Sequence, residues 1–196
     1  MRGLAWLLLT AVGGGAGYTP TEGRELLGKP APELVGIQWI QGGPLDLAAL
    51  RGKVVLVRFW LTGCPLCAAT APALRELDEH YRAQGLVVVG IHHPKSADVR
   101  DSAVVRRAVR GFGWAFPVGI DNDWKTVRAY GVGTHFRRFT SISVLFDRRG
   151  IIRFVHDGGE FHAGGGPDHR ACNRAYEAVT QAVEQALGEG RPSAGD

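Results

Sequence analysis

The sequence predicts an α/β fold in which a central mixed β-sheet is flanked by helices. Two apolar runs, 54–61 and 86–91, have the length and β-branched content of strands buried on both faces, and a helical pattern follows each of them. The chain then ends in a hairpin pattern and an amphipathic helix. With 196 residues, of which 45% are hydrophobic and 21% charged, it is long enough for one well-buried domain and a leader.

The first 17 residues have the pattern of a secretory signal peptide. Arg2 provides the positive start, residues 4–12 the apolar centre and residues 13–17 a run of glycine and alanine suited to cleavage. This apolar centre is far shorter than the ~20 residues that span a bilayer as a helix. We therefore expect a signal peptide over 1–17, a folded domain over 18–196, no stable membrane insertion and a periplasmic or secreted location, with an uncleaved membrane anchor as the alternative.

An added hairpin is predicted before the first apolar run. Residues 34–40 have the pattern of a strand, Gly42-Gly43 that of a turn, and residues 44–50 that of a returning strand.

The run 54–61 leads through Thr62-Gly63 into a helix that opens with Cys64-Pro65-Leu66-Cys67. Pro65 suits a first helical turn, where its missing N–H would have no partner. Free backbone N–H groups and the helix dipole favour an anion at this end, so a thiol held there ionises more readily. The sequence thus places two cysteines where a buried strand meets the start of a helix.

Alternating elements are predicted after this helix, which should stop at Gln84-Gly85. They are a strand over 86–91, a helix over 98–112 closed by Gly113, a strand over 116–120, a helix over 123–130, a hairpin of 141–146 with 151–156, and a helix over 168–187.

The residues around the two cysteines resemble those of the thioredoxin superfamily. Phe59-Trp60, the Cys64-x-x-Cys67 pair and Pro72 are similar in type and spacing to its TlpA-like branch, which is related to the redoxins and to AhpC-TSA proteins, and Arg51-Gly52-Lys53 matches the branch's lead-in. The resemblance covers roughly residues 28–157. It implies a thioredoxin-like three-layer fold with an added N-terminal hairpin and an inserted helix.

The same resemblance implies a protein disulfide oxidoreductase that reduces or exchanges disulfides of extracytoplasmic proteins through a mixed disulfide. Cys64 lies nearer the free N–H groups, so we expect it to be the attacking thiolate and Cys67 to resolve the mixed disulfide. The implied partners are protein thiols and disulfides and an unidentified electron donor such as a membrane thiol reductase. No cofactor is expected.

Two positions depart from the family pattern beside the cysteines. Arg58 replaces the buried aspartate of thioredoxins, and Thr70 replaces a glutamate that TlpA-like proteins often carry. Arginine cannot accept a proton. Arg58 either favours thiolates through its charge or turns to solvent or to a carboxylate partner.

A third departure lies in the loop that touches the thiols in thioredoxins. Ser141, after Thr140, occupies the position of the usual cis-proline. A cis bond without proline costs about 3–4 kcal/mol, so we expect a trans peptide and a modified substrate groove.

Histidines and a tryptophan complete the candidates near the pair. His92 and His93 end the 86–91 strand, where one of them replaces the missing proton acceptor or both serve as ordinary loop histidines. We expect Trp60 to belong to the core and shield the thiols.

Metal binding is a weaker alternative. His156, Glu160 and His162 nearly alternate along one segment and would need to join the thiols to form a site, as in copper-binding proteins of the superfamily. Cys172 lies on the apolar side of its predicted helix, so we expect it to be buried as a small hydrophobic residue. No metal is assigned.

Other function classes are less consistent with the sequence. A net charge of +4 from scattered basic residues does not indicate nucleic-acid binding. A peroxiredoxin-like peroxidase would have threonine three residues before its reactive cysteine, but Leu61 and Cys64 occupy those positions. A copper- or haem-maturation binding module is the non-enzymatic alternative.

Overall fold

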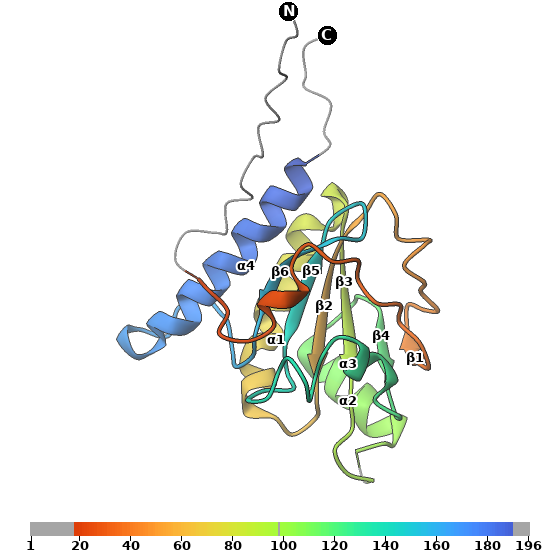
Figure 1. The fold of residues 1–196 in the computed structure, drawn as a ribbon. Coiled ribbons are helices and arrows are strands. Elements are labelled where there is room, and N and C mark those ends of the chain that lie inside the picture. The colour runs from red at the N-terminus through yellow and green to blue at the C-terminus, as the bar shows by residue number, and fades with distance from the viewer. Residues whose placement is uncertain (1–17, 98, 190–196) are drawn as a thin grey trace, which may run out of the picture.

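The computed structural model describes residues 18–97 and 99–189, which form a six-stranded sheet between helices (Figure 1). The strands are β1 (Gln38–Gln41), β2 (Val54–Trp60), β3 (Leu86–His92), β4 (Val118–Ile120), β5 (Ser143–Phe146) and β6 (Ile152–His156). The α-helices are α1 (Pro65–Tyr81), α2 (Ser102–Phe112), α3 (Lys125–Ala129) and α4 (Arg170–Gly188), with 3₁₀ turns at Arg24–Leu26, Arg82–Gln84 and Pro167–His169.

The sheet is mixed, and its strand order is β1-β4-β3-β2-β5-β6. β2 runs parallel to β3 and antiparallel to β5, so both of its edges are paired. All seven residues of β2 are buried, as its continuous apolar sequence predicted. The one polar member of this strand, Arg58, is therefore forced into the interior beside the helix that follows.

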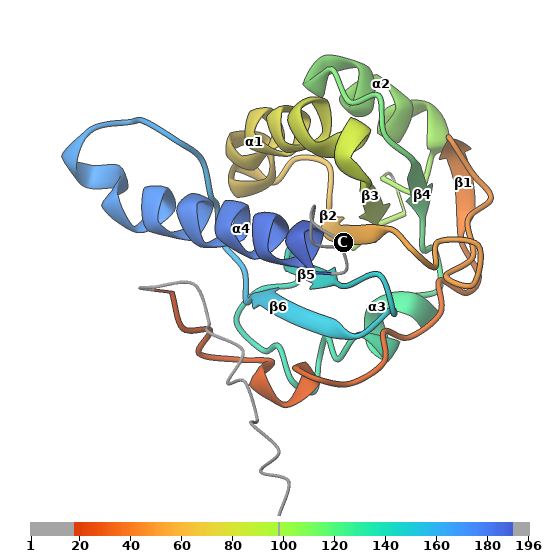
Figure 2. The same ribbon diagram turned by 90° about the horizontal axis from the view of Figure 1, so that it is seen from above.

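Helices cover the two faces of the sheet unequally (Figure 2). α1, α2 and α4 lie on one face, where their apolar residues form a core cluster with Leu56, Trp60 and Val88. α3 and the N-terminal segment lie on the other face, against Val55, Phe59 and residues of their own. The predicted α/β fold with a central mixed sheet is thus confirmed, in three layers.

The predicted N-terminal hairpin is wrong in its pairing. β1 pairs antiparallel with β4, and residues 44–50 form no strand but run on as turn-forming chain. The turn residues Gly42-Gly43 do not produce a hairpin, because β1 instead pairs with the free edge of β4 and makes buried contacts there. Gly119 of β4 makes this pairing close, since a Cβ there would lie 2.1 Å from Cγ2 of Ile37.

Some element ends also differ from prediction. α2 begins at Ser102 because the Asp101 side chain accepts a hydrogen bond from Ala103 N–H and so caps the helix. The earlier start predicted at residue 98 falls on a residue outside those described. α4 begins at Arg170 after a 3₁₀ turn. The predicted signal peptide, 1–17, also lies outside the described residues.

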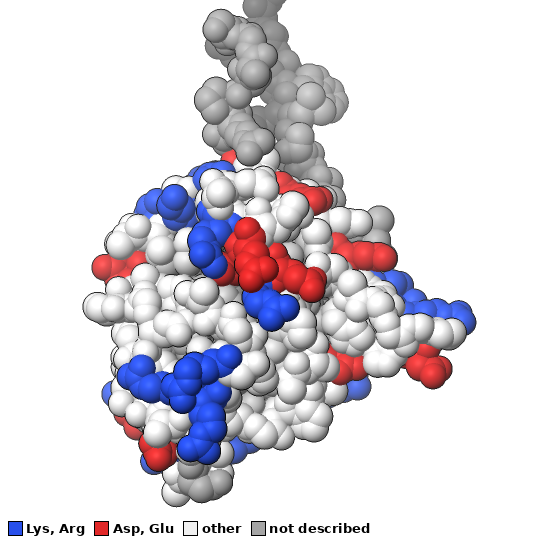
Figure 3. All heavy atoms as spheres, turned by 180° about the vertical axis from the view of Figure 1, so that it is seen from behind, with Lys and Arg blue, Asp and Glu red and all other residues white. Residues whose placement is uncertain are grey.

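Charged side chains form small separate groups of both signs on the face shown in Figure 3. Such mixing is typical of a solvated surface. Within the described residues, no helix combines the length and the apolar character that crossing a membrane requires.

Candidate active site

Cys64 and Cys67 lie where β2 meets α1, and both are free thiols. Cys64 is the N-cap of α1, and its Sγ accepts a hydrogen bond from Cys67 N–H at 3.4 Å. Pro65 is the first helical residue and is exposed to solvent. Cys64 is half-buried whereas Cys67 is only 2% exposed, so the two thiols differ sharply in access to solvent.

The two thiols also differ in ease of ionisation. Burial opposes ionisation of Cys64, but hydrogen bonds from the Cys67 thiol and from backbone N–H groups of the first turn outweigh it, and the pKa of Cys64 falls below its ordinary value. Burial raises the pKa of Cys67, and the Arg58 guanidinium offsets this only in part. The pair therefore combines an accessible thiol that ionises readily with a shielded thiol that stays protonated.

Arg58 is fully buried below this pair. Its Nη1 donates to Ser143 Oγ at 3.2 Å and its Nη2 to the Gly159 carbonyl at 3.0 Å. Its guanidinium lies 5.6 Å from the centre of the Phe161 ring. These partners are all uncharged, and in the part of the chain that the structure describes no carboxylate pairs with Arg58. The alternative in which Arg58 turns to solvent or to a carboxylate is therefore wrong.

A buried arginine without a carboxylate is an electrostatic feature of this site. Burial lowers the pKa of Arg58, and the two nearby cysteines act in the opposite direction. Arginine nevertheless keeps its charge, because a guanidinium group remains protonated well above physiological pH. The positive charge therefore favours negative charge on the sulfurs, in place of the proton acceptor that an aspartate would supply.

Ser141 contacts the second cysteine. Cys67 Sγ lies within hydrogen-bond distance of Ser141 Oγ, at 3.1 Å, and Ser141 is only 5% exposed. The Thr140–Ser141 peptide is trans, as predicted, and Thr140 is half-buried beside it. A hydroxyl thus contacts the sulfur at the position where relatives in the superfamily have proline.

Thr70 has a connecting role that its sequence position did not reveal. Its Oγ1 donates to the Leu66 carbonyl at 2.8 Å and accepts from Phe161 N–H at 3.3 Å. Arg58 holds the carbonyl of Gly159 in the same segment. The segment 159–161 is therefore fastened to both the strand and the helix that flank the cysteines. Sequence reasoning missed Gly159, Phe161 and Ser143 because the contacts join residues 85–101 positions apart.

The two histidines of the β3 end do not bond to the thiols. His92 Nε2 accepts from Thr62 N–H at 3.2 Å, and burial lowers the pKa of His92 to about 4. His93 is fully buried, neither of its ring nitrogens has a hydrogen-bond partner among the described residues, and burial lowers its pKa to about 3. Both rings are neutral at pH 7, and His92 fixes the turn before Cys64.

Trp60 is a core residue, as predicted. It is fully buried, and its ring packs 5.0 Å from both His92 and Trp114 and 5.8 Å from Phe112.

A groove of about 390 Å³ lies beside the redox pair. Leu66, between the two cysteines, forms part of its wall, and Arg138 and Phe139 line it just before Thr140. Its other lining residues include Tyr18, Thr21, Glu160 and Cys172.

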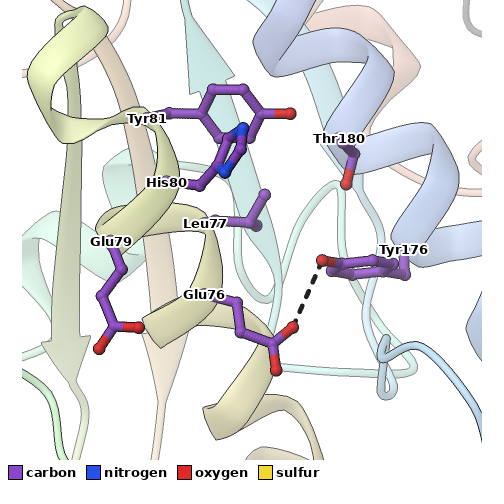
Figure 4. Close-up of a pocket in the computed structure, with 7 residues that line it drawn as sticks. All are labelled: Glu76, Leu77, Glu79, His80, Tyr81, Tyr176 and Thr180. Atoms are coloured by element: carbon purple, nitrogen blue, oxygen red, sulfur yellow. Dashed lines mark hydrogen bonds between the residues drawn. The ribbon is translucent and has the colours of Figure 1, made fainter.

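A second hollow, of about 540 Å³, lies between α1 and α4 and is shown in Figure 4. Glu76, Tyr81 and Tyr176 line it, and Tyr176 donates to Glu76 at 3.5 Å. Glu76 lies 12 residues after Cys64, which is roughly 18 Å along a helix. The hollow is therefore separate from the cysteine pair.

In the part of the chain that the structure describes, His156, Glu160 and His162 do not form a metal site with the thiols of Cys64 and Cys67. His156 is buried against Tyr18 and Phe161, and burial lowers its pKa to about 3. Glu160 and His162 instead lie beside His169 and Cys172. Cys172 is half-buried and its thiol donates to Glu160 at 3.2 Å, so its expected role as a buried hydrophobic residue is wrong.

Comparisons with known proteins agree with this geometry. The model of the AhpC/TSA family matches residues 27–155. Thiol-disulfide oxidoreductase ResA of Bacillus thuringiensis is 32% identical over 152 residues, covering 74% of this chain and 82% of ResA. Protein DipZ of Mycobacterium bovis is 32% identical over 133 residues, covering 65% of this chain but only 18% of DipZ.

Solved structures are similar in fold. A protein described as thiol:disulfide interchange protein DsbE from Chlorobium tepidum superposes with a TM-score of 0.64 at 24% identity, covering 83% of this chain and 98% of that protein. A thiol-disulfide isomerase from Corynebacterium glutamicum gives a TM-score of 0.62 at 24% identity, covering 81% and 97%. The predicted thioredoxin-like fold is confirmed.

Proposed function

The chain belongs to the AhpC/TSA family and is a relative of thiol-disulfide oxidoreductases, and from this membership we propose that it exchanges disulfides of extracytoplasmic proteins through Cys64 and Cys67. The observation that carries the proposal is the asymmetry of the pair. Cys64 is accessible and ionises readily at a helix N-terminus, whereas Cys67 is shielded and bonded to Ser141.

The reaction proceeds in two exchange steps. The Cys64 thiolate attacks one sulfur of a substrate disulfide, forms a mixed disulfide and releases the other substrate sulfur as a thiolate. Cys67 then loses its proton and attacks the Cys64 sulfur, which forms the Cys64–Cys67 disulfide and releases the second substrate thiolate. Two electrons pass to the substrate, and protonation of its thiolates completes the balance. The same two steps in reverse order oxidise a substrate dithiol.

Substrates of this site are protein segments. The groove beside Leu66 includes Arg138 and Phe139 among its lining residues, which suits an extended peptide carrying a cysteine. An electron donor, such as a membrane thiol reductase, would return the pair to its dithiol form after each reduction.

The proposed site of action is outside the cytoplasm, where protein disulfides persist. The Arg2 start and the apolar residues 4–12 support export. We further propose that residues 1–17 are removed and that a thioredoxin-like domain starting near Tyr18 remains. N-terminal sequencing of the exported protein tests this, and a protein that stays in the cytoplasm of an export-competent host would refute it.

Reduction of insulin disulfides tests the exchange chemistry. Cys64→Ser should abolish the activity, and Cys67→Ser should accumulate mixed disulfides with substrate because the resolving thiol is absent. Glu79→Gln, an exposed change in the same helix, is the control and should retain wild-type activity. Full activity in Cys64→Ser would overturn the proposal. Consumption of peroxide without insulin reduction would favour the peroxidase class, and stoichiometric copper binding without turnover would favour a binding module.

The role of Arg58 has its own test. Removing its charge in Arg58→Ala should raise the pKa of Cys64, because the buried cation favours the thiolate. The pH dependence of Cys64 alkylation measures this pKa. A curve identical to that of the wild type would show that Arg58 does not support the thiolate.

A further inference from the structure

Four side chains with metal-binding atoms converge in the segment that joins β6 to α4. Glu160, His162, His169 and Cys172 each offer one ligand atom, and these atoms all lie within 4.8 Å of one another. The segment arches out from the body of the molecule on the side where α4 begins (Figures 1 and 2). Glu160 and Cys172 also line the groove described above, but no member of the cluster takes part in the exchange steps proposed for Cys64 and Cys67.

The distances within the cluster are close to those of a tetrahedral site. His162 Nε2 and His169 Nδ1 are 3.1 Å apart, and Cys172 Sγ lies 3.2 Å from Glu160 Oε1. The same Glu160 oxygen lies 3.9 Å from His162 Nε2 and 4.0 Å from His169 Nδ1. Ligand atoms around tetrahedral zinc are about 3.3–3.8 Å apart for bonds of about 2.0–2.3 Å. On binding, the two closest pairs would separate by a few tenths of an ångström, and the widest spacing, up to 4.8 Å, would close by about 1 Å.

The tautomer of His162 is already suited to a metal. Its Nδ1 lies 3.2 Å from the Ala163 carbonyl, which can only accept, so the neutral ring carries its proton on Nδ1. Its Nε2 therefore directs a lone pair into the cluster. Such a backbone hydrogen bond on the remote nitrogen is the usual support for a metal-bound histidine.

The turn between His162 and His169 brings the two imidazole rings close together. Gly164, Gly165 and Gly166 all have positive φ, which reverses the chain between His162 and His169. A Cβ at Gly165 would lie 2.5 Å from Cγ of His169, so a side chain there would displace the imidazole.

Asn173 holds this turn against α4. Its Nδ2 donates to the Gly164 carbonyl at 3.1 Å and to the His169 carbonyl at 3.0 Å. The positions of the ligands are thus fixed by bonds that do not depend on an ion.

We propose that Glu160, His162, His169 and Cys172 form a four-ligand site for a single Zn²⁺ ion, separate from the redox pair. Thiolate and imidazole ligands in a tetrahedral arrangement favour zinc. A site with four protein ligands leaves no coordination position for substrate, as is usual for structural zinc sites. The thiolate and the carboxylate together neutralise the charge of the ion. Binding fastens the arched segment to α4.

Zinc titration of the full chain tests the proposal. The Cys64→Ser/Cys67→Ser double variant is the starting protein, so that the redox pair cannot bind metal. ZnCl₂ should bind with a stoichiometry of one and remain bound through gel filtration. Zn²⁺ should also protect Cys172 from alkylation, and Co²⁺ in its place should give the thiolate charge-transfer absorption of a tetrahedral site.

Single substitutions identify the ligands. In the same background, Cys172→Ser and His162→Ala should each weaken zinc binding by at least about 100-fold, and Gly165→Ala should weaken it through displacement of His169. His80→Ala, an exposed histidine of α1, is the matched control and should bind as tightly as the starting protein. Circular dichroism verifies that each variant is folded. Zinc binding that survives loss of Cys172 and His162, or folded protein that binds no zinc, would overturn the proposal.

Discussion

Acid should destabilise this protein because three buried histidines are neutral in the fold. His92, His93 and His156 are at most 2% exposed, and burial lowers their pKa values to about 4, about 3 and about 3 from an ordinary value of 6.5. Below pH 6.5 the unfolded chain binds protons that the folded chain does not, so stability is fully present above pH 6.5 and falls as the pH approaches these lowered values.

The size of this loss of stability follows from how far the pH lies below the ordinary histidine pKa of 6.5. At pH 5 each histidine costs about 2 kcal/mol relative to pH 7, since one pH unit corresponds to about 1.4 kcal/mol. The three together cost about 6 kcal/mol, against a total stability of about 5–15 kcal/mol for ordinary domains. Urea unfolding at pH 7 and pH 5 measures the difference in the free energy of unfolding.

A variant separates this effect from general acid sensitivity. His93→Phe keeps an aromatic ring against Trp124, 5.2 Å away, and removes two ring nitrogens for which the described residues provide no hydrogen-bond partner. It should reduce the difference between the two pH values by about 2 kcal/mol. His80→Gln, at an exposed position, should leave the difference unchanged. Equal unfolding free energies at pH 7 and pH 5 in the wild type would refute the reasoning.

Three further substitutions test contacts around the site. Thr70→Val leaves the buried N–H of Phe161 without its acceptor and should cost about 1–3 kcal/mol in urea unfolding, whereas an unchanged midpoint would mean that water replaces the hydroxyl. Asp157→Asn weakens the acceptor of Tyr18 and of three groups in Thr21 and Glu22, and should cost about 1–3 kcal/mol and speed proteolysis near Tyr18. Phe139→Ala should raise KM for insulin several-fold with kcat nearly unchanged, since the ring lines the groove but not the thiols; a fall in kcat alone would contradict this.

Local patterns predicted the centre of the fold well. The continuous apolar run of β2, the proline at the first turn of α1 and the Cys-x-x-Cys spacing each specify their own conformation within a few residues. The cysteine pair therefore emerged at the junction of strand and helix. The return strand predicted over 44–50 failed because strand pairing is decided by distant partners, here β4, rather than by the turn.

The surroundings of the pair were less predictable for a similar reason. Nothing near Arg58 in sequence indicates that its hydrogen bonds reach Ser143 and Gly159, 85 and 101 residues away. Cys172 has apolar spacing with Val179 and Val183, yet it lies near the start of α4, where the helix extends past the sheet and meets Glu160. The spacing of apolar residues identifies which face of a helix packs against the protein. It does not show at which residue along the helix that packing ends.

The charge of Arg58 should also shift the reduction potential of the cysteine pair. A cation beside the sulfurs stabilises thiolate, which exists only in the reduced form, so it makes the disulfide easier to reduce and the pair more oxidising. Arg58→Met should therefore make the midpoint potential more negative, by about 30 mV for each tenfold change in the equilibrium constant. Equilibration with glutathione buffers at pH 7, read out by alkylation, measures the potential. Arg75→Met, which removes an exposed cation of α1, should leave it unchanged. A potential that does not move in Arg58→Met, or that becomes less negative, would mean that Arg58 serves the packing of segment 159–161 and not the redox balance of the thiols.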